Sequence, residues 1–84
     1  MNYKFSIGLE AKAVPEPLGQ WLENNLPVDF TLKPRTRLRL RFLEVTITGN
    51  TTEDVAAKHI AFVKVVRACG FLGVVVKDKK IQRI

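Results

Sequence analysis

Hydrophobic and polar residues alternate at the start of the chain. Apolar side chains occupy every second position from residue 3 to residue 9, and polar or small residues stand between them. Because successive side chains of a strand point to opposite faces, this pattern predicts a strand with one buried face. After Pro15 and Pro17, the apolar residues Leu18, Trp21 and Leu22 follow at helical spacing. They predict a helix over about residues 16–25, with Pro17 in its first turn.

The centre of the chain changes the phase of its alternation. Apolar side chains occupy even positions from 38 to 42 and odd positions from 43 to 47. A flat strand cannot bury both sets on one face. We therefore expect one long strand over residues 37–48, with a bulge near Phe42 and Leu43 that reverses its faces, or a strand covered on both sides. Upstream, residues 28–32 predict a short strand, and residues 33–36 either a turn or an irregular edge.

A second helix follows a start signal. The stretch from Gly49 to Asp54 supplies a turn, a capping side chain and two acidic residues for the first helical turn. Gly70 is a typical residue to follow the helix end. Between them, helical spacing predicts a buried face made of Val55, His59, Phe62, Val63, Val66 and Cys69. Residues 71–76 then predict a buried strand and residues 81–84 a short terminal strand, separated by a charged turn.

The predicted elements follow the order β-α-β-β-α-β, with an extra strand at the end. This order is typical of an α+β domain in which two helices cover a small antiparallel sheet, the split βαβ or ferredoxin-like arrangement. The 84 residues fit a single domain, residues 1–84, with a small core. The order resembles that of RNA-recognition modules, but the basic stretch from Arg37 to Arg41 replaces the aromatic third-strand residues with which those modules stack bases. We therefore assign the chain to no family.

Basic residues exceed acidic residues, and they are concentrated in two segments. The chain has 14 Lys and Arg against 8 Asp and Glu, a net charge of +6. Residues 31–41 contain five basic residues and no acidic one, and residues 77–84 contain four against a single aspartate. The whole positive excess therefore comes from these two segments, which favours a polyanionic partner.

The basic residues of the first segment recur at every second position. They are Lys33, Arg35, Arg37, Arg39 and Arg41. In one extended strand all five lie on the same face, about 6.6 to 6.8 Å apart, close to the spacing of phosphates along a nucleic-acid backbone. Guanidinium groups also pair bidentately with phosphate oxygens. We therefore predict a nucleic-acid-binding site for DNA or RNA, which Lys77, Lys79 and Lys80 extend if the last strand lies beside the arginine strand.

Other interpretations of this basic row stay open. The cations can form a charged edge that prevents aggregation, or can pair within the protein with Glu10, Glu16, Glu23 and Asp29. The row also suits a small adaptor or inhibitor that binds an acidic protein surface. Homodimer formation is a further expectation, because Ile60 and Val65 fall outside the main apolar face of the second helix.

Residue types that carry catalysis or bind metals are scattered. His59 is the only histidine and Cys69 the only cysteine, which excludes an internal disulfide and a zinc site of four Cys and His ligands. We expect His59 to be a core or interface residue and Cys69 to be a packed thiol. The chain is therefore expected to be no enzyme and to need no cofactor. It has no apolar run long enough to span a membrane and no signal-peptide pattern, so we expect a cytoplasmic protein.

Overall fold

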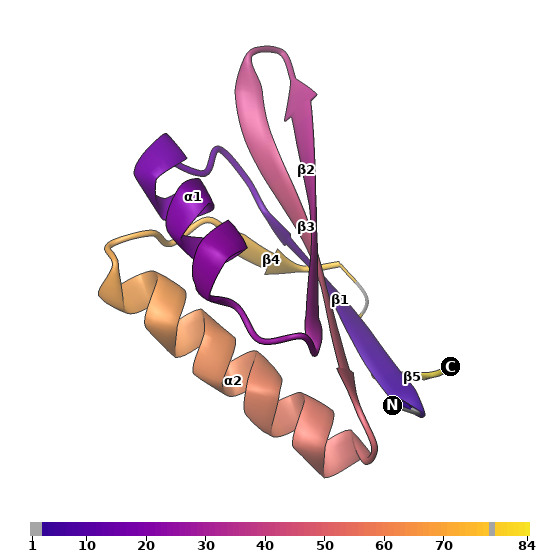
Figure 1. The fold of residues 1–84 in the computed structure, drawn as a ribbon. Helices are drawn as coiled ribbons and strands as arrows, with labels where there is room; N and C mark the ends of the chain where they lie inside the picture. The colour runs from indigo at the N-terminus through magenta and orange to yellow at the C-terminus, as the bar shows by residue number, and fades with distance from the viewer. Residues whose placement is uncertain (1–2, 78) are drawn as a thin grey trace.

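The computed structural model describes residues 3–77 and 79–84, which form two helices and five strands (Figure 1). In chain order these are β1 (Phe5–Ala11), α1 (Glu16–Asn25), β2 (Phe30–Arg37), β3 (Leu40–Gly49), α2 (Thr52–Ala68), β4 (Val74–Val76) and β5 (Gln82–Arg83). The predicted α+β class is confirmed, as are both predicted helices. Thr51 caps α2, since its hydroxyl accepts a hydrogen bond of 3.0 Å from the Asp54 N–H, and Gly70 follows the helix end with φ of 83°.

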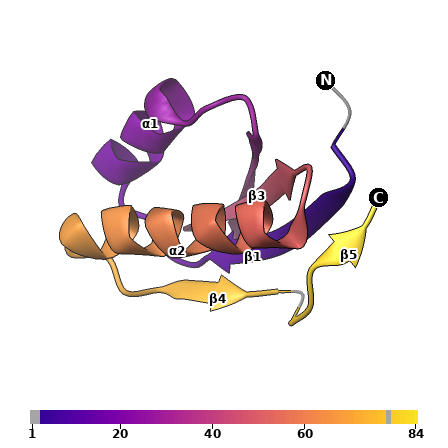
Figure 2. The ribbon, with the colours of Figure 1, turned by 90° about the horizontal axis from the view of Figure 1, so that it is seen from below.

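The strands form one antiparallel sheet in the order β2-β3-β1-β4. β3 pairs with β1 along one edge, whereas β4 and β5 follow one another along its other edge (Figure 2). β3 therefore lies between β1 and β2, the two strands that flank α1. The predicted strand over residues 71–76 is shorter than expected, because only its second half pairs with β1. The predicted charged turn after it includes Asp78, which lies outside the described residues.

The core lies between one face of the sheet and the two helices, which share the same side of it (Figure 1). The odd positions of β1 and β3 supply the sheet side of this core, as the alternation in β1 predicts. Buried apolar side chains of the two strands are Ile7, Leu9, Ala11, Leu43, Val45 and Ile47, and those of the helices include Leu18, Leu22, Val55, Phe62 and Val66.

The predicted apolar face of α2 is correct in its centre and wrong at its end. His59 and Val63 are half-buried beside the buried residues of this face, whereas Cys69 is exposed. Cys69 follows the last helical residue and has a ψ of 5°, so the helical period no longer determines the direction of its side chain. The packed thiol predicted from the sequence is therefore wrong.

The segment predicted as one long strand, residues 37–48, contains the turn and most of the second strand of a β-hairpin that β2 and β3 form. The chain reverses at Leu38 and Arg39, whose φ angles are 51° and 65°. Positive φ at both central residues is typical of a two-residue type I′ turn. Pairing runs without a break from Arg37 opposite Leu40 to Phe30 opposite Ile47, so the predicted bulge is wrong.

The change of phase in the sequence has a different cause. Leu43 and Val45 face the helices, whereas Leu40 and Phe42 lie on the uncovered face of the sheet, and Leu38 lies in the turn. The apolar residues at even positions are thus outside the core.

Pro34 lies within β2, opposite Leu43. β2 is at the edge of the sheet, where a proline is tolerated because its missing N–H is not needed for pairing. The pair next to a two-residue turn, here Arg37 and Leu40, exchanges hydrogen bonds, and bonded pairs recur at every second position. Pro34 falls between bonded pairs, so its nitrogen points away from β3.

Candidate functional site

The hairpin divides the five cations that the sequence predicts on one face. Lys33, Arg35 and Arg37 lie on the uncovered face of β2, and Arg39 lies in the turn. Arg41 lies on the opposite face, toward the helices. A Cβ atom built on Gly19 of α1 would be 3.2 Å from the Arg41 Nη1.

The prediction that all five cations lie in one row on the same face is therefore wrong. Residues opposite one another on paired strands share a face. Arg41 is opposite Thr36, whereas Lys33 and Arg35 occupy the other set of positions. The turn interrupts the alternation and sends the fifth cation to the helix side.

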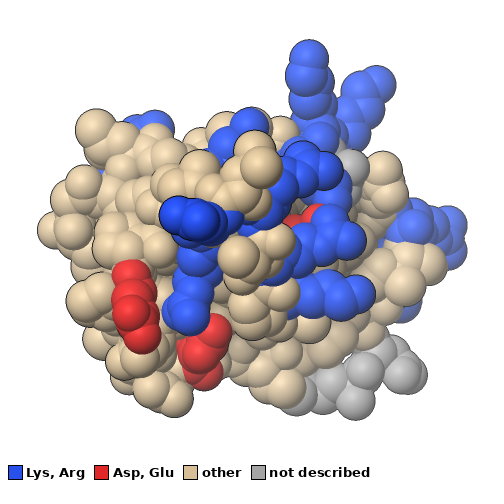
Figure 3. Space-filling view, turned by 90° about the horizontal axis from the view of Figure 1, so that it is seen from above, with Lys and Arg blue, Asp and Glu red and all other residues tan. Residues whose placement is uncertain are grey.

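Of the three cations of β2, Arg35 and Arg37 line a shallow depression on the uncovered face. Across from them on β3 lie Leu40 opposite Arg37, Phe42 opposite Arg35 and Glu44 opposite Lys33. The depression has a volume of about 400 Å³ and is lined by Glu10, Arg35, Thr36, Arg37, Phe42 and Glu44. Viewed from the hairpin end, Lys and Arg side chains spread over this part of the surface, with acidic atoms visible between them (Figure 3). The depression is thus lined by two arginines and two acids, with Phe42 as its apolar residue.

Glu44 is the acidic residue that pairs with this basic surface. Its Oε1 lies 2.9 Å from the Arg35 Nη1 and 2.9 Å from the Lys77 Nζ. The hydrogen bond from Lys77, together with the charge of Arg35, holds the pKa of Glu44 below its usual range, and the same bond raises the pKa of Lys77. Glu44 is therefore a carboxylate at neutral pH.

Glu44 carries no signal in the sequence, because its place opposite Lys33 emerges only from the hairpin register. Among the four acids considered as internal partners, Asp29 pairs with Lys58 instead.

The lysines near the C-terminal end differ in their relation to the hairpin. Lys77 follows β4 and reaches Glu44 on β3, across β1. Lys79 and Lys80 are exposed in the connection between β4 and β5. The sequence predicted that these lysines extend the basic row if the last strand lies beside the arginine strand. That condition is not met, because β1 and β3 separate β4 and β5 from β2.

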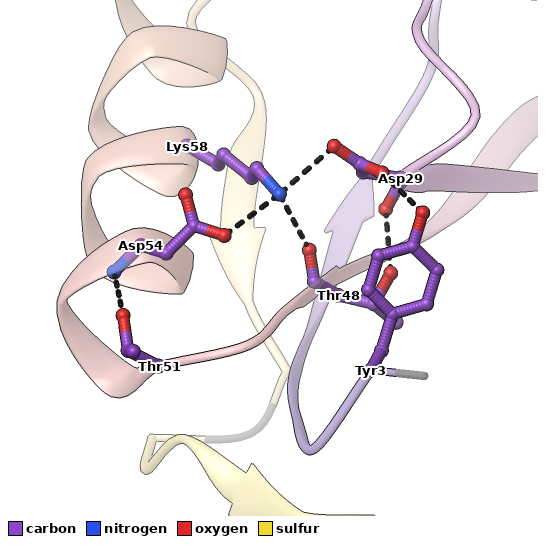
Figure 4. Close-up of polar contacts among 6 residues, drawn as sticks. All are labelled: Tyr3, Asp29, Thr48, Thr51, Asp54 and Lys58. Atoms are coloured by element: carbon purple, nitrogen blue, oxygen red, sulfur yellow. Dashed lines mark hydrogen bonds and ion pairs between the residues drawn. The ribbon is translucent and has the colours of Figure 1, made fainter. Parts of the chain in front are cut away.

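A polar cluster fastens the base of the hairpin to α2 (Figure 4). The Lys58 Nζ lies 2.8 Å from Asp29 and 2.9 Å from Asp54, and it donates a hydrogen bond of 3.0 Å to the carbonyl of Thr48. The Tyr3 hydroxyl donates to the Asp29 carboxylate. Hydrogen bonds from Lys58 and then Tyr3 lower the pKa of Asp29, and the bond with Asp29 raises the pKa of Lys58. The cluster lies at the end of the hairpin opposite to the turn, which extends beyond the helices (Figure 1).

Neither a metal site nor a similarity to known proteins assigns a role to this surface. Within residues 3–77 and 79–84, no group of three or more His, Cys, Asp and Glu side chains is arranged to hold a metal ion. No helix in the same part of the chain is long and apolar enough to cross a membrane. No protein-family model, no curated protein and no solved structure matches this chain. The exposed cations of the β2–β3 hairpin are therefore the feature of this chain that points to a function.

Proposed function

We propose that this chain is a small, non-catalytic, cytoplasmic nucleic-acid-binding module that contacts phosphates through the β2–β3 hairpin. The observation that carries the proposal is the gathering of Lys33, Arg35 and Arg37 on an uncovered sheet face, with Arg39 at the turn, all of them exposed. Side chains on one face of a strand repeat at about 6.6 to 6.8 Å, and guanidinium groups match phosphate oxygens in shape and charge. Such a surface suits a phosphodiester backbone.

The charge balance of the uncovered face supports a polyanionic partner. Lys33, Arg35, Arg37 and Lys77 lie on or reach this face, against the two acids Glu10 and Glu44, and Glu44 pairs with two of the four cations. Like charges at such spacing repel one another, and a chain of phosphates relieves that repulsion while releasing its counterions. Binding of this kind is electrostatic and depends weakly on nucleotide sequence.

Two finer proposals accompany this one. The strand order, with β3 between the strands that flank α1, supports assignment to the split βαβ or ferredoxin-like arrangement, which hosts many functions. Homodimer formation through Ile60 and Val65, which are 56% and 41% exposed, stays a prediction, and sedimentation equilibrium tests it.

Fluorescence anisotropy tests the binding function. Labelled single- and double-stranded DNA and RNA are titrated with the protein over a range of salt concentrations. If Lys33, Arg35, Arg37 and Arg39 each neutralise one phosphate, the logarithm of the duplex affinity falls with a slope of about −3.6 against the logarithm of salt concentration. The double variant Arg35→Gln and Arg37→Gln should bind more weakly and reduce this slope by about 2.

A matched double variant distinguishes binding at a site on the hairpin from an effect of the protein's net charge. Lys64→Gln and Arg67→Gln remove the same charge from exposed positions of α2, on the helix side of the molecule. This pair should leave most of the affinity intact. Equal losses in both doubles would contradict a site on the hairpin. If the native chain binds none of the four nucleic acids at low salt, the function is wrong, and an acidic protein surface becomes the partner to test.

A further inference from the structure

The turn of the hairpin carries an apolar residue at its outer end. Leu38 is 90% exposed and stands between Arg37 and Arg39 in the sequence. The turn end extends beyond the helices (Figure 1), and the polar cluster around Lys58 holds the opposite end of the hairpin. The narrow end of the two-stranded ribbon thus carries a highly exposed aliphatic side chain, and its neighbours in the chain on both sides are arginines.

The backbone of this turn does not favour the residues that occupy it. Leu38 and Arg39 both adopt positive φ, where turns of this type usually carry Asn, Asp or Gly. Leu38 is therefore disfavoured twice, by its conformation and by its exposure to water. Strained residues of this kind are concentrated at functional sites, where binding compensates for the loss of stability.

We propose that Leu38 is a wedge that enters the minor groove of duplex DNA and inserts between two base pairs, while Arg37 and Arg39 contact the phosphates on either side. This inference rests on the proposed nucleic-acid-binding function. Apolar side chains, leucine among them, act in this way when they partly unstack a base step and kink the duplex, and arginine is attracted to the narrow minor groove. Insertion buries the aliphatic surface that is exposed in the free protein.

The same features select duplex DNA over other nucleic acids. Single strands are held by aromatic side chains that stack on bases, and the residue at the tip is aliphatic. The minor groove of an RNA duplex is wide and shallow, so its walls do not contact both sides of a narrow ribbon end. The minor groove of B-DNA is about 6 Å wide, and a two-residue turn is the shortest common connection of a β-ribbon.

The test uses a DNA duplex with 2-aminopurine beside a flexible TA step and a pair of fluorophores at its ends. The native protein should raise the 2-aminopurine fluorescence, because the base becomes unstacked, and should bring the ends closer through a kink of about 20° to 90°. In Leu38→Asn both changes should disappear. The affinity of this variant for the duplex should fall only about three- to ten-fold. The variant loses the free energy gained by burying the leucine, but it also avoids the free-energy cost of unstacking a base step.

Leu38→Asn should fold at least as well as the native chain, because asparagine tolerates positive φ and is polar. A higher midpoint of thermal unfolding together with the lost kink is the expected result. The control is Leu72→Asn, which alters a residue that is 76% exposed in the connection between α2 and β4. This control should retain the fluorescence rise and the kink.

The outcomes separate the wedge from the binding function. If the native protein binds duplex DNA with a steep salt dependence but without unstacking, or if Leu38→Asn still unstacks the base, the wedge is wrong and the phosphate-binding function stands. If the native protein binds single strands or RNA more tightly than duplex DNA, the wedge is likewise wrong and the phosphate-binding function stands. Absence of binding to every nucleic acid overturns both.

Discussion

Replacing Glu44 by glutamine is expected to tighten nucleic-acid binding. The Glu44 carboxylate lies 2.9 Å from the Arg35 Nη1, so a phosphate oxygen that contacts the other side of this guanidinium lies about 6 Å from a fixed negative charge. At that distance, effective dielectric constants between about 40 and 80 correspond to a repulsion that weakens binding about three- to ten-fold. Glu44→Gln removes this repulsion and releases Arg35 and Lys77 for the ligand.

The assay is the salt titration by fluorescence anisotropy described above. Glu44→Gln should bind about three- to ten-fold more tightly at moderate salt, and its salt dependence should be steeper. Glu23→Gln makes the same change of charge at an exposed position of α1, on the helix side, and should have a smaller effect. Unchanged or weaker binding by Glu44→Gln would refute the reasoning, since it would mean that phosphates do not approach the uncovered sheet face.

Three further predictions concern the fold that supports the hairpin. Leu43→Ala, at a fully buried position of β3, should lower the free energy of unfolding by about 2 to 5 kcal/mol in urea titrations. Gly49→Ala should also destabilise the protein in the same assay, by about 1 to 3 kcal/mol, because the new Cβ would lie 2.9 Å from a methyl group of the buried Val55. Ionised Asp29 stabilises the native state fully above its ordinary pKa of about 3.9, and the benefit is lost as the pH falls toward its lower pKa in the folded protein. Thermal unfolding between pH 7 and pH 2 should therefore show the native chain and Asp29→Asn converging in stability below about pH 4, whereas a constant difference over the whole range would contradict this role of Asp29.

Local signals in the sequence predicted the helices and the first strand accurately. The alternation around Ile7 and Leu9 and the helix-start signal in residues 49–54 depend on residues close together in the chain, and each corresponds to the observed element. Such signals need no knowledge of distant contacts. They were sufficient for the α+β class and for both helices.

The sequence does not predict the hairpin, because its turn lacks the Asn, Asp or Gly residues that usually mark a two-residue turn. Leu38 and Arg39 are residues that usually avoid positive φ, so the chain appeared continuous at the position where it reverses. That error moved Arg41 to the wrong face. The pairing of Glu44 with Lys77, 33 residues further along the chain, depends on the same register and on the position of β4, neither of which is a local property.

Pro34 has a consequence for how copies of this chain behave at high local concentration. The free edge of β2 exposes the backbone of the even-numbered residues, and Pro34 interrupts that row because it has no N–H. The flanking cations Lys33 and Arg35 add repulsion between two such edges. Copies crowded side by side on one polyanion should therefore stay separate instead of joining their sheets into larger aggregates.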